Sequence, residues 1–121
     1  MKILLAILLA VFVGTVSAET RNWTESEKLW GATAGVLLLG DWATTNNMTH
    51  RYKEGYYEHN PLLGPHPTAN QVNLHFLIAV PAVYLLADQV PNYRTEILQV
   101  TSMVELIAVG NNLRLGLRFQ F

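Results

Sequence analysis

Three carboxylates of this chain occur in surroundings that solvation alone does not readily explain. Asp41 is the single charge of a nearly uncharged stretch, residues 29–45. Glu58 stands beside a histidine in a long polar segment, and Glu105 lies in a helical segment with few other charges. A carboxylate buried in a membrane must be compensated by protonation, a hydrogen bond or a cation. These residues are therefore candidates for proton or cation chemistry.

Other polar side chains recur at positions from which they can reach these carboxylates. Thr45 lies one helical turn after Asp41, so both share one helix face. On the third helical segment, Glu105 falls within an arc of roughly 80° with Ser102 and Asn112 at 100° per residue. We therefore predict a polar node that consists of Asp41, Thr45, Glu58, Asn60, His75 and Glu105.

Two interpretations of this node stay open. Close carboxylates share a proton or bind a cation, which would suit an ion-handling protein or a membrane enzyme. Alternatively, the polar side chains only join the helices, since such contacts contribute about 0.6 kcal/mol each in membrane proteins. In that structural interpretation, Glu58 and Asn60 hydrogen-bond the ends of adjacent helices, because Asn60-Pro61 favours a turn that fixes their directions.

Motifs for other chemistry are absent from the sequence. His59 and His66 are the candidate metal ligands, although no histidine spacing matches an established zinc pattern. The chain has no cysteine, which excludes disulfides, thiolate catalysis and cysteine-ligated metal sites. Because phosphate-binding glycine loops and hydrolase signatures are also missing, we expect no cofactor.

Helical signals predict three elements that would position the node. The capping box Thr24-Glu25-Ser26-Glu27 starts a helix over residues 25–45, and further apolar segments predict helices over 72–90 and 93–109. The polar and aromatic loop 46–71 between the first two is long enough to be functional.

Glycine and proline residues add detail to these helices. Gly31, Gly35 and Gly40 are spaced as in membrane helices that approach a neighbour closely. Pro81 is expected to kink the second helix, and Gly110 to end the third. The glycines therefore predict close approach of another helix to the first.

The amino-terminal segment predicts export. Lys2, an apolar run from Ile3 to Val13 and the small residues Val16-Ser17-Ala18 indicate a signal peptide over residues 1–18, cleaved after Ala18. The apolar run is shorter than the roughly 20 residues that a membrane-spanning helix needs. The alternative is an uncleaved first helix. In both cases the chain from residue 19 begins outside the cytoplasm.

The carboxyl-terminal segment has a different pattern. Apolar and polar residues alternate from Leu113 to Phe121, which indicates an extended or interfacial tail. A terminal phenylalanine after such alternation also resembles the last strand of outer-membrane barrels. With three spans, the loop and this tail would be cytoplasmic. The basic residues on the cytoplasmic side would then be Arg51, Lys53, Arg114 and Arg118, and those on the outer side would be Arg21, Lys28 and Arg94. Four against three agrees weakly with the positive-inside rule.

Two short motifs resemble a known family. Gly40-Asp41-Trp42-Ala43-Thr44-Thr45, followed by Tyr57-Glu58-His59-Asn60-Pro61-Leu62-Leu63-Gly64, is similar to the D-x-x-T-T … E-x-N-P-L pattern of the DUF5658-like family of small multi-pass membrane proteins. The resemblance covers residues 29–90. It implies a membrane protein with signature positions at Asp41, Thr45, Glu58, Asn60 and Pro61, and it supplies no activity.

Composition narrows the choice of partners. Charged residues make up 14% of the chain, against roughly 25% in an average soluble domain. The net charge of −1 lacks the cationic excess that nucleic acids select, so we expect no nucleic-acid partner. Membrane lipid, a second copy or another membrane protein are the expected partners.

These observations predict an all-α fold: a small helical membrane bundle of about three helices after the signal peptide, with residues 19–121 as one domain. The expected function is that of a small integral protein of the bacterial inner membrane, structural or part of a membrane assembly, and whether it is an enzyme stays open. The alternatives are a membrane enzyme or ion-handling protein that uses the polar node, and an exported soluble or outer-membrane protein.

Overall fold

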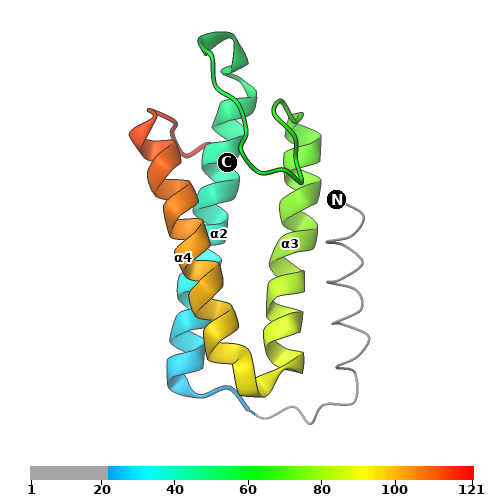
Figure 1. Ribbon diagram of the computed structural model, residues 1–121, viewed down its shortest axis with the longest axis vertical. Helices are drawn as coiled ribbons and strands as arrows, with labels where there is room; N and C mark the ends of the chain where they lie inside the picture. The colour runs from blue at the N-terminus through cyan, green and yellow to red at the C-terminus, as the bar shows by residue number, and fades with distance from the viewer. Residues whose placement is uncertain (1–21) are drawn as a thin grey trace.

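The computed structural model describes residues 22–121, and the predicted signal peptide lies outside this range. The described chain is helical, as predicted, and holds no β-strand. Its elements are α2 (Glu25–Thr49), the 3-10 turn η1 (Tyr52–Glu54), α3 (Ala69–Gln89), the 3-10 turn η2 (Pro91–Tyr93) and α4 (Arg94–Arg114). Figure 1 shows the three long helices side by side, with the loop 50–68 and the tail 115–121 at one end of the bundle and η2 at the other.

Two capping boxes start the first two of these helices. Thr24 Oγ1 accepts a hydrogen bond from Glu27 N, and Glu27 Oε2 accepts one from Thr24 N. Thr68 and Gln71 repeat this arrangement at the start of α3. Because this second box satisfies the first free amides, α3 begins at Ala69 rather than at the expected residue 72.

Both α2 and α4 continue beyond their expected ends. α2 reaches Thr49, because the asparagine side chains of its last turns make tertiary contacts: Asn46 Nδ2, for example, donates to Asn73 Oδ1 of α3 (3.2 Å). α4 continues through Gly110 to Arg114, because the amide of Asn112 in its last turns bonds to α2. The alternating pattern therefore begins inside a helix, and the following tail is irregular rather than a strand.

Close approach of α3 to α2 depends on two of the predicted glycines. Tyr84 Oη donates to the backbone oxygen of Gly31 (2.6 Å). A Cβ atom at Gly35 would lie 2.5 Å from the same hydroxyl. Gly40 instead faces Val109 of α4 and Phe119 of the tail, each 3.4 Å from an added Cβ. The glycine spacing therefore serves two neighbours, α3 and α4.

The apolar core consists of two small clusters. Ala34, Ala87 and Leu98 bring together all three helices near the η2 end. Leu38, Val72 and Phe76 join α2 to α3 nearer the loop. Between these clusters and the loop, the polar residues Thr44, Thr45 and Asn46 of α2 are buried beside the apolar residues Ala43 and Met48.

Candidate functional site: a polar cavity beneath the loop

A cavity of about 610 Å³ lies between α2, α4, the loop and the start of the tail. Five residues of the predicted node line it: Asp41, Thr45, Glu58, Asn60 and Glu105. The sixth, His75, does not line the cavity, but its Nε2 lies 3.5 Å from Asn60 Nδ2. The structure thus brings these residues to one end of the bundle, while their shared function stays a prediction.

Asp41 accepts side-chain hydrogen bonds from two helices at this cavity. Its Oδ1 accepts hydrogen bonds from Thr45 Oγ1 (3.2 Å), one turn later on α2, and from Asn112 Nδ2 (3.3 Å) on α4. Asn112 Nδ2 also donates to Thr44 Oγ1 (2.9 Å). Asp41 therefore joins α2 to α4.

Glu105 faces Asp41 across the interface of α4 and α2. Its Oε2 atom is buried and has no N–H or alcohol O–H donor in residues 22–121, and its side-chain partner is the carboxyl group of Asp41. Two ionised carboxylates at this range repel each other, so the arrangement is favourable only with a proton or another cation between them. Ser102, expected on the same arc, instead bonds to Leu98 O of its own helix (2.7 Å).

Glu58 and Asn60 organise the loop itself, which differs from their expected role at helix ends. Glu58 Oε1 accepts from Asn60 N (2.8 Å), and Asn60 Oδ1 accepts from Leu62 N (2.9 Å). These bonds to nearby backbone amides fold the Asn60-Pro61 turn locally. The turn holds Glu58 in the cavity wall and Asn60 against His75.

The two candidate metal ligands each pack on a tyrosine. The His59 ring lies 4.6 Å from the Tyr57 ring centroid, and the His66 ring lies 4.8 Å from that of Tyr52 in an edge-to-face arrangement. Among the residues that the structure describes, no group of three or more His, Cys, Asp or Glu side chains is arranged to hold a metal ion. His59 also lines the cavity, whereas His66 does not.

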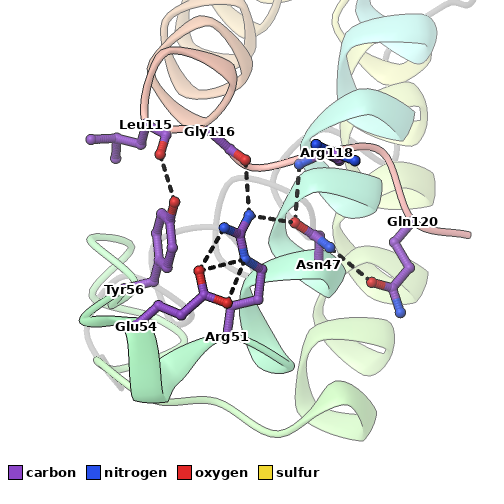
Figure 2. A network of polar contacts seen from close by, with 8 residues as sticks. All are labelled: Asn47, Arg51, Glu54, Tyr56, Leu115, Gly116, Arg118 and Gln120. Atoms are coloured by element: carbon purple, nitrogen blue, oxygen red, sulfur yellow. Dashed lines mark hydrogen bonds and ion pairs between the residues drawn. The ribbon is translucent and has the colours of Figure 1, made fainter.

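A polar network between the loop and the tail was not predicted from the sequence. Figure 2 shows Arg51 at its centre, donating from Nη1 to Gly116 O (2.8 Å) and forming an ion pair with Glu54 (Nη2–Oε2 2.6 Å). Tyr56 Oη donates to Leu115 O (2.6 Å). These contacts fix the tail beside the loop, and both segments contribute to the cavity wall.

Asn47 extends this network along the tail. Its Oδ1 accepts from Arg118 N (3.0 Å), and its Nδ2 donates to Gln120 Oε1 (3.0 Å), as Figure 2 also shows. Beyond it, the Trp42 ring packs against Phe121, with centroids 5.9 Å apart. The only sequence signal for these contacts is the run Asn46-Asn47, whose polar side chains suggested a loop.

Two loop residues have shifted acid–base properties. The hydrogen bond from Arg51 holds the pKa of the Glu54 carboxyl below its usual range. Burial, followed by the negative charge of Glu58, raises the pKa of the Tyr52 phenol. Tyr52 Oη donates to Pro67 O (2.5 Å), so the neutral phenol is the form that ties the two ends of the loop together.

Comparisons of the chain with protein-family models, with curated proteins and with solved structures find no match.

Proposed function

We propose that this chain is a small integral membrane protein whose three helices lie together in the bilayer and direct their polar contacts inward. The observation that carries this proposal is the placement of side chains on α4. Along its middle turns the exposed large side chains are apolar, and Ile107, the most exposed of them, is 70% accessible; the others are Val100, Met103, Val104 and Leu106, with Leu113 in the last turn. The exposed polar side chains of α4, Glu96, Asn111 and Arg114, lie in its first and last turns. A soluble bundle would present the opposite distribution.

The charges of α4 fit the same proposal. Arg94 is buried in an ion pair, and Glu105 lines the cavity. Glu96 and Arg114 lie in the first and last turns, where they can reach the headgroup region. Only α3, among the described helices, is long and apolar enough to cross a membrane by composition alone. Part of the low mean hydropathy of α4 comes from polar residues that face inward, such as Arg94 and Ser102.

The outward face of α3 adds to this support. Leu74, Leu77, Ile78 and Leu85 are exposed along it, with Leu77 71% accessible. Soluble monomers rarely expose a contiguous apolar surface of this extent. Lipid would cover this face in the proposed bilayer arrangement.

We assign the chain to the bacterial inner membrane after export, with the loop and tail on the cytoplasmic side. Its role there is structural or that of a partner in a membrane assembly. Membership in the DUF5658-like family is part of the same proposal. In its support, Asp41 of the first motif and Glu58 of the second line the same cavity.

Single-cysteine labelling in intact membranes tests this proposal, because the chain has no cysteine of its own. We expect Ile107→Cys and Ile78→Cys to resist a water-soluble maleimide until the membrane is dissolved in denaturant. His66→Cys, at an exposed loop position, is the matched control and should react once the cytoplasmic side is made accessible. Rapid labelling at Ile107, or release of the protein by osmotic shock or alkaline carbonate, would contradict a membrane-embedded bundle.

The cavity favours a second candidate function, the handling of an ion or small solute. Asp41, Glu58 and Glu105 line a single cavity, although they come from α2, the loop and α4. Under this hypothesis, Asp41→Asn and Glu58→Gln should leave insertion and thermal stability nearly intact while abolishing binding or transport. If both substitutions only destabilise the bundle, the carboxylates serve architecture alone.

A further inference from the structure

We infer that the cavity beneath the loop binds a ligand that carries a primary ammonium group, held between the carboxyl groups of Asp41 and Glu105. This inference deepens the second candidate function, and only its lipid form depends on the proposed membrane location. The volume of about 610 Å³ is within the range of small-molecule sites.

The charge of the lining selects a cation. Four carboxylates line the cavity, at Asp41, Glu54, Glu58 and Glu105, and no lysine or arginine is among the lining residues. Glu54 is already paired with Arg51. The other three carboxylates form no salt bridge within residues 22–121, so they leave a net negative lining. An anionic ligand would therefore be repelled.

The buried oxygen of Glu105 gives the cation a specific place. Its Oε2 has no N–H or alcohol O–H donor in the described chain, and its neighbour is the carboxyl group of Asp41, with which it can share only a proton or another cation. Asp41 Oδ1 is held in position by Thr45 and Asn112. An ammonium group has three N–H donors, so it can bond to both carboxylates at once and remove their mutual repulsion.

The remaining walls favour an organic cation over a metal ion. Phe76, Val104, Ala108 and Leu117 supply apolar surface on the same cavity, and Tyr56 and Tyr57 add aromatic rings at its loop side. Divalent metal ions require a shell of oxygen ligands, whereas an alkylammonium pairs its charged end with carboxylates and its carbon chain with apolar surface. Tyrosine rings also attract ammonium groups through cation–π interactions.

Two sources could supply this chemistry: a free amine, such as a polyamine, and the amine headgroup of a membrane lipid. The cavity is partly enclosed by the loop and tail, which are joined by the Tyr56–Leu115 and Arg51–Gly116 hydrogen bonds. It also lies at the end of the bundle, where lipid headgroups would be found in the proposed bilayer arrangement. The free amine and the lipid headgroup are therefore tested in separate experiments.

The first experiment titrates the full chain, in phosphatidylcholine nanodiscs, with pentylamine, spermidine and 1-pentanol by calorimetry. We expect pentylamine to bind more tightly than 1-pentanol, which matches its chain length and lacks the charge. Equal affinity of the two would show an apolar cavity without cation selectivity and overturn the inference. If Mg²⁺ binds and neither pentylamine nor spermidine does, the cavity is a metal site and the inference is wrong.

A lipid arm distinguishes the two sources. Nanodiscs that contain phosphatidylethanolamine are compared with phosphatidylcholine alone, and the lipid retained on the purified protein is identified by mass spectrometry. Selective retention of phosphatidylethanolamine, with loss of pentylamine binding in those discs, identifies the headgroup as the ligand. Unchanged pentylamine binding identifies a free amine. If amines fail to bind while Ile107→Cys stays protected from labelling, the ammonium site is excluded and the membrane proposal stands.

Matched variants locate the site. Glu105→Gln and Asp41→Asn keep side-chain size and should lower pentylamine affinity by roughly tenfold to a hundredfold, since each removes a charge-assisted hydrogen bond. Glu96→Gln, on an exposed position of the same helix, is the control and should leave affinity unchanged. Should the carboxylate variants fail to fold, Ala108→Leu fills the cavity without changing charge and should also weaken binding. Unchanged affinity in a folded Glu105→Gln or in Ala108→Leu would contradict the inference.

Discussion

Arg94 of α4 and Glu27 of α2 form a fully buried ion pair at the end of the bundle opposite the cavity. The Nη1–Oε2 distance is 3.3 Å, and the two side chains are 0% and 3% exposed. Arg94 Nε also donates to Ala87 O (2.9 Å), at the end of α3, and its guanidinium lies 4.8 Å from the Trp23 ring centroid. One arginine therefore joins all three helices.

Glu27→Gln should destabilise the protein strongly. Removing one partner of a buried ion pair typically costs about 3–5 kcal/mol. Arg94 keeps a second, partly exposed carboxylate, Asp88 (Nη2–Oδ1 3.7 Å), so we expect the lower part of that range. Glutamine keeps the size of the side chain and can still accept the hydrogen bond from Thr24 N, so the capping box is preserved. Thermal unfolding of the purified protein, followed by circular dichroism, measures the loss.

Glu25→Gln is the matched control for this experiment. Glu25 forms an ion pair with Lys28 on the exposed surface of the same helix turn, with side chains 90% and 59% exposed. Exposed pairs contribute about 0–1 kcal/mol, so this variant should unfold close to the wild type. Equal effects of the two substitutions would show that the buried pair contributes no more than the exposed one.

Sequence patterns predicted the helical class and the approximate place of each helix, because long apolar stretches with few charges and the Thr24 capping box are local signals. They did not predict the role of Arg94, which looked like an ordinary flanking charge. Its burial depends on Glu27, 67 positions earlier in the chain, and such a pairing has no local signature. The capping box at Thr68 and Gln71 was a local signal, and it marks the true start of α3.

Gly35→Ala should disturb the contact between α2 and α3. An added Cβ atom would lie 2.5 Å from Tyr84 Oη, so the hydroxyl must leave its hydrogen bond to Gly31 O. In contrast, a Cβ at Gly110 meets no atom within 4 Å, and alanine there should stabilise the helix by roughly 0.5–1 kcal/mol. We expect Gly35→Ala to be less stable than Gly110→Ala by at least about 1 kcal/mol.

A double-mutant cycle with Tyr84→Phe checks the cause. Phenylalanine lacks the hydroxyl that the new methyl group would meet. Gly35→Ala should therefore cost less free energy of unfolding in the Tyr84→Phe background than in the wild type. An identical cost in both backgrounds would place the strain elsewhere in the helix interface.

The ion pair of Arg51 and Glu54 should respond to acid. Because the pKa of Glu54 is lowered in the folded protein, the pair contributes stability above the ordinary glutamate value of about 4.3, and this contribution is lost as the pH falls through the lowered value. Carbon-13 NMR of the Glu54 carboxyl can follow the titration. Arg51→Gln should move its midpoint to higher pH.

Lys53→Gln provides the control, since Lys53 also lies in η1 but makes no ion pair with Glu54 among the described contacts. Its substitution should change the Glu54 midpoint much less than Arg51→Gln does. If both variants shift the midpoint equally, the general positive charge of the loop is responsible and the hydrogen bond is not.

The candidate cavity was predictable only in part. Asp41 and Thr45 share a face by helical spacing, and their hydrogen bond agrees with that expectation. Glu105 and Asn112 share one face of the third predicted helix, and from this spacing we predicted that they could meet Asp41. The contribution of the tail could not be predicted, because the alternation from Leu113 indicated an extended segment and gave no sign of its partner. Asn47, which fixes that tail, resembled a loop residue.

Asn47→Ala should release the tail from α2 without unfolding the bundle. The substitution removes the acceptor of Arg118 N and the donor to Gln120 Oε1. Since each such bond contributes about 1 kcal/mol, we expect roughly tenfold faster hydrogen exchange at the Arg118 amide. The thermal midpoint of the bundle should change little, because Asn47 lies outside both apolar clusters.

Asn92→Ala serves as the control for tail release. Asn92 is exposed in η2, at the opposite end of the bundle, and its substitution should leave exchange at Arg118 unchanged. An Arg118 amide that exchanges equally slowly in Asn47→Ala would mean that other contacts, such as the bond from Gln120 N to Ala43 O (3.1 Å), hold the tail. Since Leu115 and Leu117 line the cavity, tail release should also weaken pentylamine binding, which couples the architecture of the tail to the proposed site.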